Sequence, residues 1–432
     1  MIHSEIDDFG ADSNGVREFF QGKCGIALKS GVPQNYAALM NEQFSSSTTV
    51  AYGKILFVLL FSGFVITGMV TTILGAVLPL FISRWSLDDT QAGIFFTTQF
   101  TGSLGGVGLS SALMAAKGYR PALIGGYLLM AAGLLGLNSD SHQLALASIA
   151  ACGCGVGLVI PGTNLYVAEI SGSRRSTALS LLNLAWGAGA VLCPILFLAA
   201  ERRDRVGGVL GLFAVVSLVF AVILRLLPFL SPRWSDSSQR AENSRARFPL
   251  HIPVALGLLF FIYIGTEGSI SGWAAEHAKR LGDVEGALWR LAPTFFWAGL
   301  LIGRGIVSLL LLRVQENYLV LGGLVLAATG TAFLLKASSP GVVGASVALT
   351  GLGLSGSYPI FIAWLSKWYG ERARRVGGIM FALAALGGAI LPWGVGYVSK
   401  HSSGLRVGLL VPFAGCFVML VLVLVLRRRV AS

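Results

Sequence analysis

One acidic residue lies inside an apolar segment of the chain. Glu267 occurs within residues 263–273, whereas the other acidic residues of the 20 in the sequence lie in polar segments or at the ends of apolar ones. A charge held in hydrocarbon is costly, so such a residue usually faces a cavity or a partner and has a functional role. We therefore expect Glu267 to bind and release a proton. The alternative is a structural carboxylate that bonds a neighbouring helix.

Two aromatic residues and three glycines surround this acid. Tyr263 precedes Glu267 by one helical turn and shares its face. Gly265, Gly268 and Gly272 predict a weakened helix, which is typical of half-helices that meet a substrate. Trp273 is either part of the same site or an anchor at the membrane surface.

Three side-chain amides lie inside other apolar segments. Gln99, Asn164 and Asn183 each offer donors and acceptors that suit a hydroxyl-rich ligand. The alternative role is hydrogen bonding between helices. We expect all three to line a binding site.

Aromatic residues in the apolar segments could complete such a site. Trp297 offers a face on which a sugar ring could stack, as do Trp186, Trp364 and Trp393, although contact with lipid or core is the commoner role of all four. Tyr358 combines a phenol with a helix break at Pro359.

Four charged residues suggest a gate or a structural pairing. Arg304 lies deep in an apolar segment, and we favour a structural contact with the carbonyl groups of a helix end over contact with an anionic substrate. Glu169, Arg174 and Arg175 flank the end of another apolar segment. They predict either a gate-closing ion pair or a plain surface cluster.

These residues require a membrane scaffold to hold them. The chain of 432 residues is 54% hydrophobic and 12% charged, against about 25% charged residues in an average soluble domain. Twelve stretches are long enough to cross a bilayer. They span approximately 55–82, 91–115, 121–138, 143–168, 177–200, 207–229, 251–273, 290–312, 318–335, 341–366, 376–398 and 406–426.

The second six spans repeat the first six. Residues 124–133 return as residues 321–330, and residues 147–155 return as residues 345–353, at nearly the same offset. A duplicated six-helix unit is the architecture of secondary transporters that rock two halves around a central site. The sequence therefore predicts an all-α membrane protein with two pseudo-symmetric six-helix bundles.

Charge and composition set the organisation of the chain. Lys and Arg are more frequent in the segments on the side of the N-terminus, so the formal charge of +12 reflects orientation and not nucleic-acid binding. We expect a multi-pass monomer in the plasma (inner) membrane with both termini cytoplasmic.

No cofactor or metal is expected, and the true start could be Met40. The predicted parts are a tail (1–54), two bundles (55–229 and 251–426), a linker (230–250) and a basic tail (427–432).

The pattern resembles the major facilitator superfamily. Its loop signature between spans two and three is eroded to Gly118 and Arg120, with Ala115 at the acidic position. Within the superfamily the chain is most similar to the fucose–proton symporters and their sodium-dependent glucose transporter relatives. The motifs that carry this similarity are Asn164 with Arg175 and Gly187-Ala188-Gly189 before Pro194; Tyr263-x-Gly265-x-Glu267 with Trp273; Phe295-Phe296-Trp297 with Gly303-Arg304; and Tyr358-Pro359 with Gly387-Gly388 and Pro392.

This resemblance implies a hexose or another polyol as substrate, moved with H⁺ or Na⁺ by alternating access. The fucose symporter pattern has an acidic residue in span one, whereas residues 55–81 contain none, so coupling would depend on Glu267. The alternatives are an exporter of drugs or metabolites with the same fold, and a receptor that binds solute without moving it. An organic-anion carrier is disfavoured because Arg304 is the only deep cation. The spans hold no arrangement typical of an enzyme.

Overall fold

The computed structural model describes residues 47–171, 175–201, 203, 205–227, 251–282, 288–369 and 373–430. Helices and turns account for these residues, with no β-strand among them. The chain divides into two units at Leu56, and the unit Leu56–Ser432 contains every helix from α4 onward. The predicted linker 230–250 and most of the predicted tail 1–54 lie outside the described residues, so the proposed domain boundaries stay predictions.

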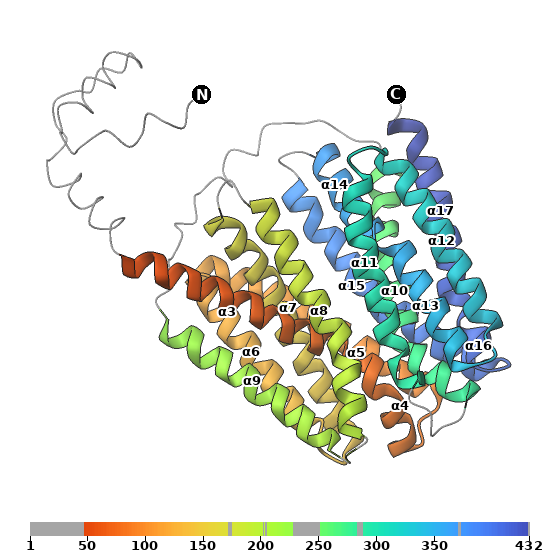
Figure 1. Cartoon of the computed structure of the whole chain (residues 1–432), viewed down its shortest axis with the longest axis horizontal. Coiled ribbons are helices and arrows are strands. Elements are labelled where there is room, and N and C mark those ends of the chain that lie inside the picture. The colour runs from red at the N-terminus through yellow and green to blue at the C-terminus, as the bar shows by residue number, and fades with distance from the viewer. Residues whose placement is uncertain are drawn as a thin grey trace, which may run out of the picture. The chain divides into compact units, whose positions relative to one another are not determined.

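The first half of the helical bundle runs from α3, which begins at Ser47, to α9 (Figure 1). Its first span is broken at Thr72, which separates α3 from α4, and α5 begins with a reciprocal capping box between Asp88 and Gln91. The bounds are α3 Ser47–Thr71, α4 Ile73–Trp85, α5 Asp89–Lys117, α6 Tyr119–Gly136, α7 His142–Ile170, α8 Arg175–Glu201 and α9 Val206–Leu226.

The second half contains six more spans. Span ten is broken between Leu354 and Ser357, directly before Pro359, which confirms the predicted break. The bounds are α10 His251–Leu281, η3 Leu288–Leu291, α11 Ala292–Leu310, α12 Glu316–Lys336, α13 Pro340–Leu354, α14 Ser357–Tyr369, α15 Ala373–His401, α16 Leu405–Gly408 and α17 Leu410–Val430.

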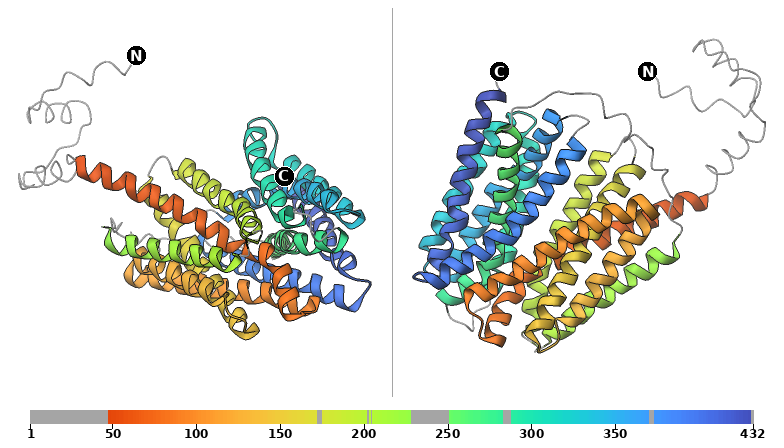
Figure 2. Two further views of the ribbon diagram at one scale, coloured as in Figure 1. Left: turned by 60° about the horizontal axis from the view of Figure 1, so that its bottom comes forward. Right: turned by 180° about the vertical axis from the view of Figure 1, so that it is seen from behind.

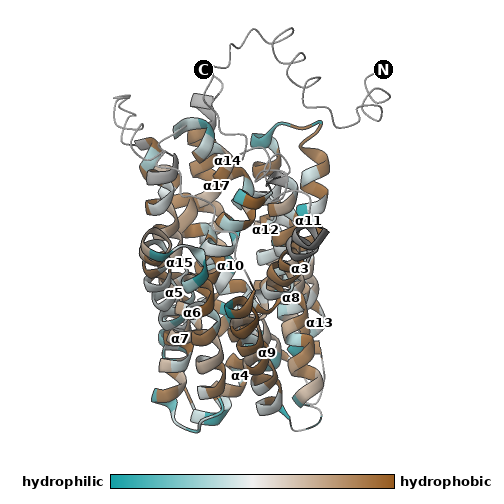
Figure 3. Cartoon of the chain, turned by 90° about the vertical axis from the view of Figure 1, so that its left-hand side faces the viewer, coloured by the Kyte–Doolittle hydropathy of each residue, from teal (hydrophilic) through white to brown (hydrophobic). Residues whose placement is uncertain are grey.

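The helices have the length and surface expected in a bilayer. Ten helical segments of the described part are long and apolar enough to span a membrane. The two remaining long helices, α5 and α6, have a lower mean hydropathy because they contain more small and polar residues. Both pack along α7. Most residues along the helices are hydrophobic, and the turns at both ends of the helices include hydrophilic residues (Figure 3). The twelve predicted spans are therefore confirmed.

The sequence repeat corresponds to repeated helix packing. In the first half, α5 and α6 both pack against α7, and in the second half α11 and α12 pack in the same way against α13. A methyl group at Gly102 would lie 2.3 Å from the carbonyl oxygen of Ala150, and one at Gly299 would lie 2.2 Å from that of Ala348. Small residues at these crossings let the backbones touch, as membrane helix pairs require.

This packing predicts the effect of a single methyl group. We expect Gly299→Ala to destabilise the protein by about 1–3 kcal/mol, because the added carbon overpacks a backbone contact. Gly305, on the same helix, has nothing within 4 Å of an added carbon, so Gly305→Ala is the matched control. Unfolding of both variants in detergent measures the difference, and equal stability would contradict the proposed crossing.

The two halves meet near one end of the bundle. Figures 1 and 2 show the helices of the first half grouped apart from those of the second, with α4 close to the second half. Contacts between halves involve α5 with α15, α8 with α11, and α4 with α10. Thr97 on α5, for example, donates a hydrogen bond to the carbonyl oxygen of Ala389 on α15 at 2.7 Å. We call the end where α4 ends and α5 begins the joined end.

Candidate functional site

Glu267 lies on α10 with its carboxyl group held by a tyrosine. The hydroxyl group of Tyr263 donates a hydrogen bond to Oε2 of Glu267 at 2.7 Å. Tyr263 is fully buried, whereas Glu267 is half-buried. The Tyr263 ring stacks on that of Tyr358 with centroids 5.5 Å apart. Because Tyr358 follows the break in span ten, two spans fix one carboxyl group in a defined orientation.

A cation acts on this carboxyl group from a third helix. The charge of Arg304 on α11 acts on the carboxyl of Glu267 and the phenol of Tyr358. No ion pair within 4 Å joins Arg304 to Glu267, and Nε of Arg304 is buried with no hydrogen-bond partner among the described residues. A buried donor of this kind normally has a partner. The predicted contact with helix-end carbonyls is not seen for this atom.

Two tryptophans join the halves between α8 and α11. Trp186 on α8 and Trp297 on α11 form an edge-to-face pair with ring centroids 5.4 Å apart. Trp297 is buried, and Nε1 of Trp186 is a buried donor without a partner in the described part of the chain. The pair therefore combines aromatic surface with a free hydrogen-bond donor, which is the chemistry that a sugar ring requires.

Of the three predicted amides, Gln99 bonds another helix and the two asparagines bond their own helices. Nε2 of Gln99 donates to the carbonyl oxygen of Thr71 at 3.0 Å, beside the break in span one. Nδ2 of Asn164 donates to Ile160, and Nδ2 of Asn183 donates to Leu179, each at 2.8 Å along its own helix. Gln99 is buried, Asn164 is half-buried and Asn183 is exposed. Their role in binding a ligand stays a prediction.

The helix around Glu267 differs from the prediction made for it. We expected the nearby glycines to weaken the span, but α10 is continuous from His251 to Leu281. A methyl group at Gly265 would lie 2.7 Å from the carbonyl oxygen of Gly387, so this glycine lets α15 approach. The interruptions occur instead in spans one and ten. Trp273 is fully buried and donates to the carbonyl oxygen of Pro392 at 2.9 Å, so it is not a surface anchor.

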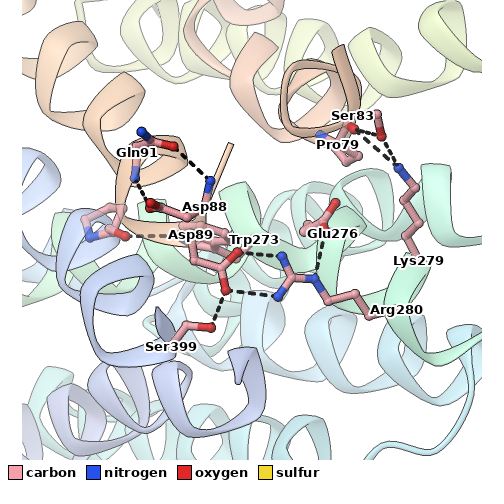
Figure 4. Close-up of polar contacts among 11 residues, drawn as sticks. Pro79, Ser83, Asp88, Asp89, Gln91, Trp273, Glu276, Lys279, Arg280 and Ser399 are labelled. Atoms are coloured by element: carbon pink, nitrogen blue, oxygen red, sulfur yellow. Dashed lines mark hydrogen bonds and ion pairs between the residues drawn. The ribbon is translucent and has the colours of Figure 1, made fainter. Parts of the chain in front are cut away.

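Charged residues bridge the halves at the joined end (Figure 4). Arg280 binds Asp89 in a bidentate pair, with Nη1 3.0 Å from Oδ2 and Nη2 2.5 Å from Oδ1. Its Nε also donates to Glu276 at 2.7 Å. Ser399 donates to the same carboxylate of Asp89. We call this group and its neighbours the inter-half cluster, which comprises Asp88, Asp89, Glu276, Lys279, Arg280, Ser399 and Lys400.

The outer members of the inter-half cluster extend these links. Lys400 on α15 lies 2.8 Å from Oδ2 of Asp88, and its hydrogen bond holds the pKa of that carboxyl group below its usual range. Lys279 on α10 donates to Ser83 on α4 at 2.8 Å. Elsewhere at the joined end, Nη2 of Arg290 donates to Oε1 of Glu201 at 2.7 Å. The contacts of Lys400 and Lys279 hold α5 and α4 against α15 and α10, and the contact of Arg290 joins η3 to α8.

Sequence reasoning missed this cluster. The prediction that Glu267 is the only acid inside a span was wrong, because α10 runs past the expected end at residue 273 and Glu276 is 4% exposed. Oε2 of Glu276 is buried without a hydrogen-bond partner in the described residues. The sequence did contain a signal for the cluster. Two acids, Asp88 and Asp89, lie at the start of α5, and bases lie at the ends of α10 and α15.

The predicted gate at the opposite end is only partly described. Glu169 on α7 accepts a hydrogen bond from the hydroxyl group of Tyr119, at the start of α6. Arg174 and the side chain of Arg175 lie outside the described residues, so their pairing with Glu169 stays a prediction. No cluster of three or more potential metal ligands occurs in the part of the chain that the structure describes.

Comparison with known proteins identifies the family. A model of the Major Facilitator Superfamily matches residues 60–313, which is more than half of the chain. The chain therefore belongs to the Major Facilitator Superfamily, as its repeat and motifs predicted, and it is a membrane transporter and not an enzyme.

Three relatives extend this result. The uncharacterized transporter YfkL of Bacillus subtilis is 24% identical over 349 residues, covering 77% of this chain and 86% of YfkL. The glucose/mannose transporter GlcP of the same organism is 24% identical over 354 residues, covering 77% of this chain and 85% of GlcP. The E. coli fucose:proton symporter FucP, in an outward conformation, has a TM-score of 0.60 at 20% identity, covering 85% of this chain and 98% of FucP. The resemblance to the fucose symporter is therefore confirmed for the fold.

Proposed function

We propose that this transporter moves a small neutral polar solute, a sugar, by alternating access and couples its movement to protons. The observation that carries the proposal is the half-buried carboxyl of Glu267, held by one phenol and acted on by one arginine. Protonation removes a negative charge from a low-dielectric site, so a change of proton occupancy changes the cost of moving the loaded carrier. GlcP and FucP, which the chain resembles, support a sugar as the solute.

The surroundings of Glu267 favour H⁺ over Na⁺ as the coupling ion. A sodium ion needs several oxygen ligands, whereas the contacts of Glu267 are a phenol that donates to it and a positive charge that would repel the ion. A proton needs only one acceptor and neutralises the carboxylate by itself. The carboxyl group then exchanges between an ionised form that attracts Arg304 and a neutral form that does not.

The binding site we propose lies between the halves. Trp186 and Trp297 supply aromatic surface and an indole N–H that has no partner among the described residues. Arg304 supplies a second donor without a partner in that part of the chain, and Tyr358, Gln99, Asn164 and Asn183 are the remaining candidates. With both termini in the cytoplasm, the joined end faces the outside. The structure then corresponds to a state that is closed outside, and the opposite state requires the inter-half cluster to open.

Uptake by the purified protein in liposomes tests the proposal. We expect an inward proton gradient to drive accumulation of radiolabelled D-glucose, D-mannose or L-fucose, and we expect a sodium gradient at equal pH to drive none. Liposomes without protein give the background, and labelled citrate and ethidium serve as anion and drug controls. Accumulation driven only by sodium would overturn the choice of ion. Movement of citrate or ethidium without any sugar would overturn the choice of solute.

A further inference from the structure

The surface of the first half carries a groove that the transport proposal does not use. It lies between α6 and α9, has a volume of about 430 Å³, and is lined by Arg120, Pro121, Ile124, Gly125, Leu128 and Arg225. This volume is within the range of sites that hold small ligands. The groove is therefore large enough for a polar headgroup.

Two cations at one end of this groove have no carboxylate partner in the described part of the chain. Arg120 donates from Nε to the carbonyl oxygen of Leu224 at 3.1 Å and from Nη2 to that of Arg225, so it is fixed against the end of α9. The side chain of Arg225 is exposed and makes no hydrogen bond or ion pair within the described residues. Neither guanidinium group pairs with an acid there. Two unneutralised arginines favour an anion that carries several oxygens.

The rest of the groove is apolar and open towards the lipid. Ile124 and Leu128 follow Arg120 at one-turn intervals along α6, and Leu128 is 45% exposed on the outer surface of the bundle. A cation pair at a helix end with an apolar strip beneath it matches a phospholipid, whose phosphate lies at the membrane surface and whose chains run inward. A free phosphate ion would gain nothing from the apolar strip.

We propose that this groove binds the headgroup of an anionic phospholipid, with Arg120 and Arg225 on the phosphate and the acyl chains along Ile124 and Leu128. Basic pockets between transmembrane helices bind anionic lipids in this way. The site is distinct from the central carboxyl group and does not depend on the sugar proposal. Arg120 also links α6 to α9, so an occupied site would stabilise the first half.

Gly125 makes it possible to block the groove without removing charge. An added carbon at Gly125 meets nothing within 4 Å, and the same is true of Gly322, which is its counterpart in the sequence repeat. Gly125→Phe should therefore fill the groove without a clash, and Gly322→Phe is its matched control. Arg225→Gln removes one charge, and Arg313→Gln, an exposed arginine after α11, controls for the change in net charge.

The test measures lipid binding by the full chain in detergent, through the shift in unfolding temperature and by native mass spectrometry. Added phosphatidylglycerol should stabilise the wild type more than phosphatidylethanolamine does. We expect about five-fold weaker binding in Arg225→Gln and no retained phosphatidylglycerol in Gly125→Phe, with both controls unchanged. Equal stabilisation of all the variants would overturn the proposal. Competition by inorganic phosphate as effective as that by the lipid would also overturn it and identify a free-phosphate site.

Discussion

Replacing Glu267 by Gln is expected to abolish proton-driven accumulation of the sugar while leaving sugar exchange intact. Glutamine has nearly the same size, and its carbonyl oxygen can still accept the hydrogen bond from Tyr263. It cannot ionise, so the carrier loses the charge change that links proton binding to its two states. Because coupling between two ligands is reciprocal, sugar should also cease to drive proton uptake.

Two assays in proteoliposomes separate these effects. Under an inward proton gradient, the internal sugar concentration of Glu267→Gln should rise only to the external value. Counterflow, in which unlabelled internal sugar exchanges for labelled external sugar without a gradient, should persist. Glu316→Gln is the matched control, because Glu316 also accepts a hydrogen bond from an aromatic side chain, that of Trp364 at 3.0 Å, but at the start of α12. It should accumulate sugar as the wild type does.

The alternatives give different results in the same assays. Accumulation above the external concentration by Glu267→Gln would remove this residue from the coupling role. Loss of counterflow together with accumulation would assign Glu267 to solute binding or to the conformational change. Tyr263→Phe provides an intermediate case, because it leaves the carboxyl group but removes the donor that orients it. It should shift the pH dependence of uptake while retaining coupling.

The sequence predicted the parts of the fold that depend on local pattern. Apolar length identified the spans, and the repeat of residues 124–133 at 321–330 anticipated that α6 and α12 would occupy equivalent places. The contacts bear this out, because Gly126 lies against Gly155 as Gly323 lies against Gly353. A close backbone crossing requires a small residue at a fixed position. Such a crossing can therefore be recognised from the sequence.

Contacts between the halves have no comparable sequence pattern. Asp89 and Arg280 are 191 positions apart in the chain, and Ser399 is a further partner from a third helix. Each is a polar residue at the end of a span, where polar residues occur in any membrane protein. Hydropathy also placed the end of α10 too early, because burial against α4 and α5 sustains the helix through Glu276 and Lys279. Sequence reasoning therefore singled out Glu267, whose role stays a prediction, but not the inter-half cluster at the joined end.

The inter-half cluster predicts how the two states of the carrier are balanced. Arg280→Gln removes the bidentate pair with Asp89 and the bond to Glu276, and both carboxylates are largely buried. A hydrogen bond to a charged group contributes about 1.5–3 kcal/mol, so the variant should shift the population by about ten-fold or more towards separation of the halves. Lys400→Gln is the control, because its pair with Asp88 is more exposed and should contribute about 0–1 kcal/mol.

Spin labels at the joined end measure this shift. Asn138 and Ser403 are exposed residues in the turns after α6 and α15, so labels at Asn138→Cys and Ser403→Cys report the separation of the halves in a background without other accessible cysteines. The wild type should show mainly the short distance, and Arg280→Gln should add a longer one. An unchanged distance distribution in Arg280→Gln would mean that packing of α5 on α15, through contacts such as Thr97 with Ala389, closes this end without help from the charges.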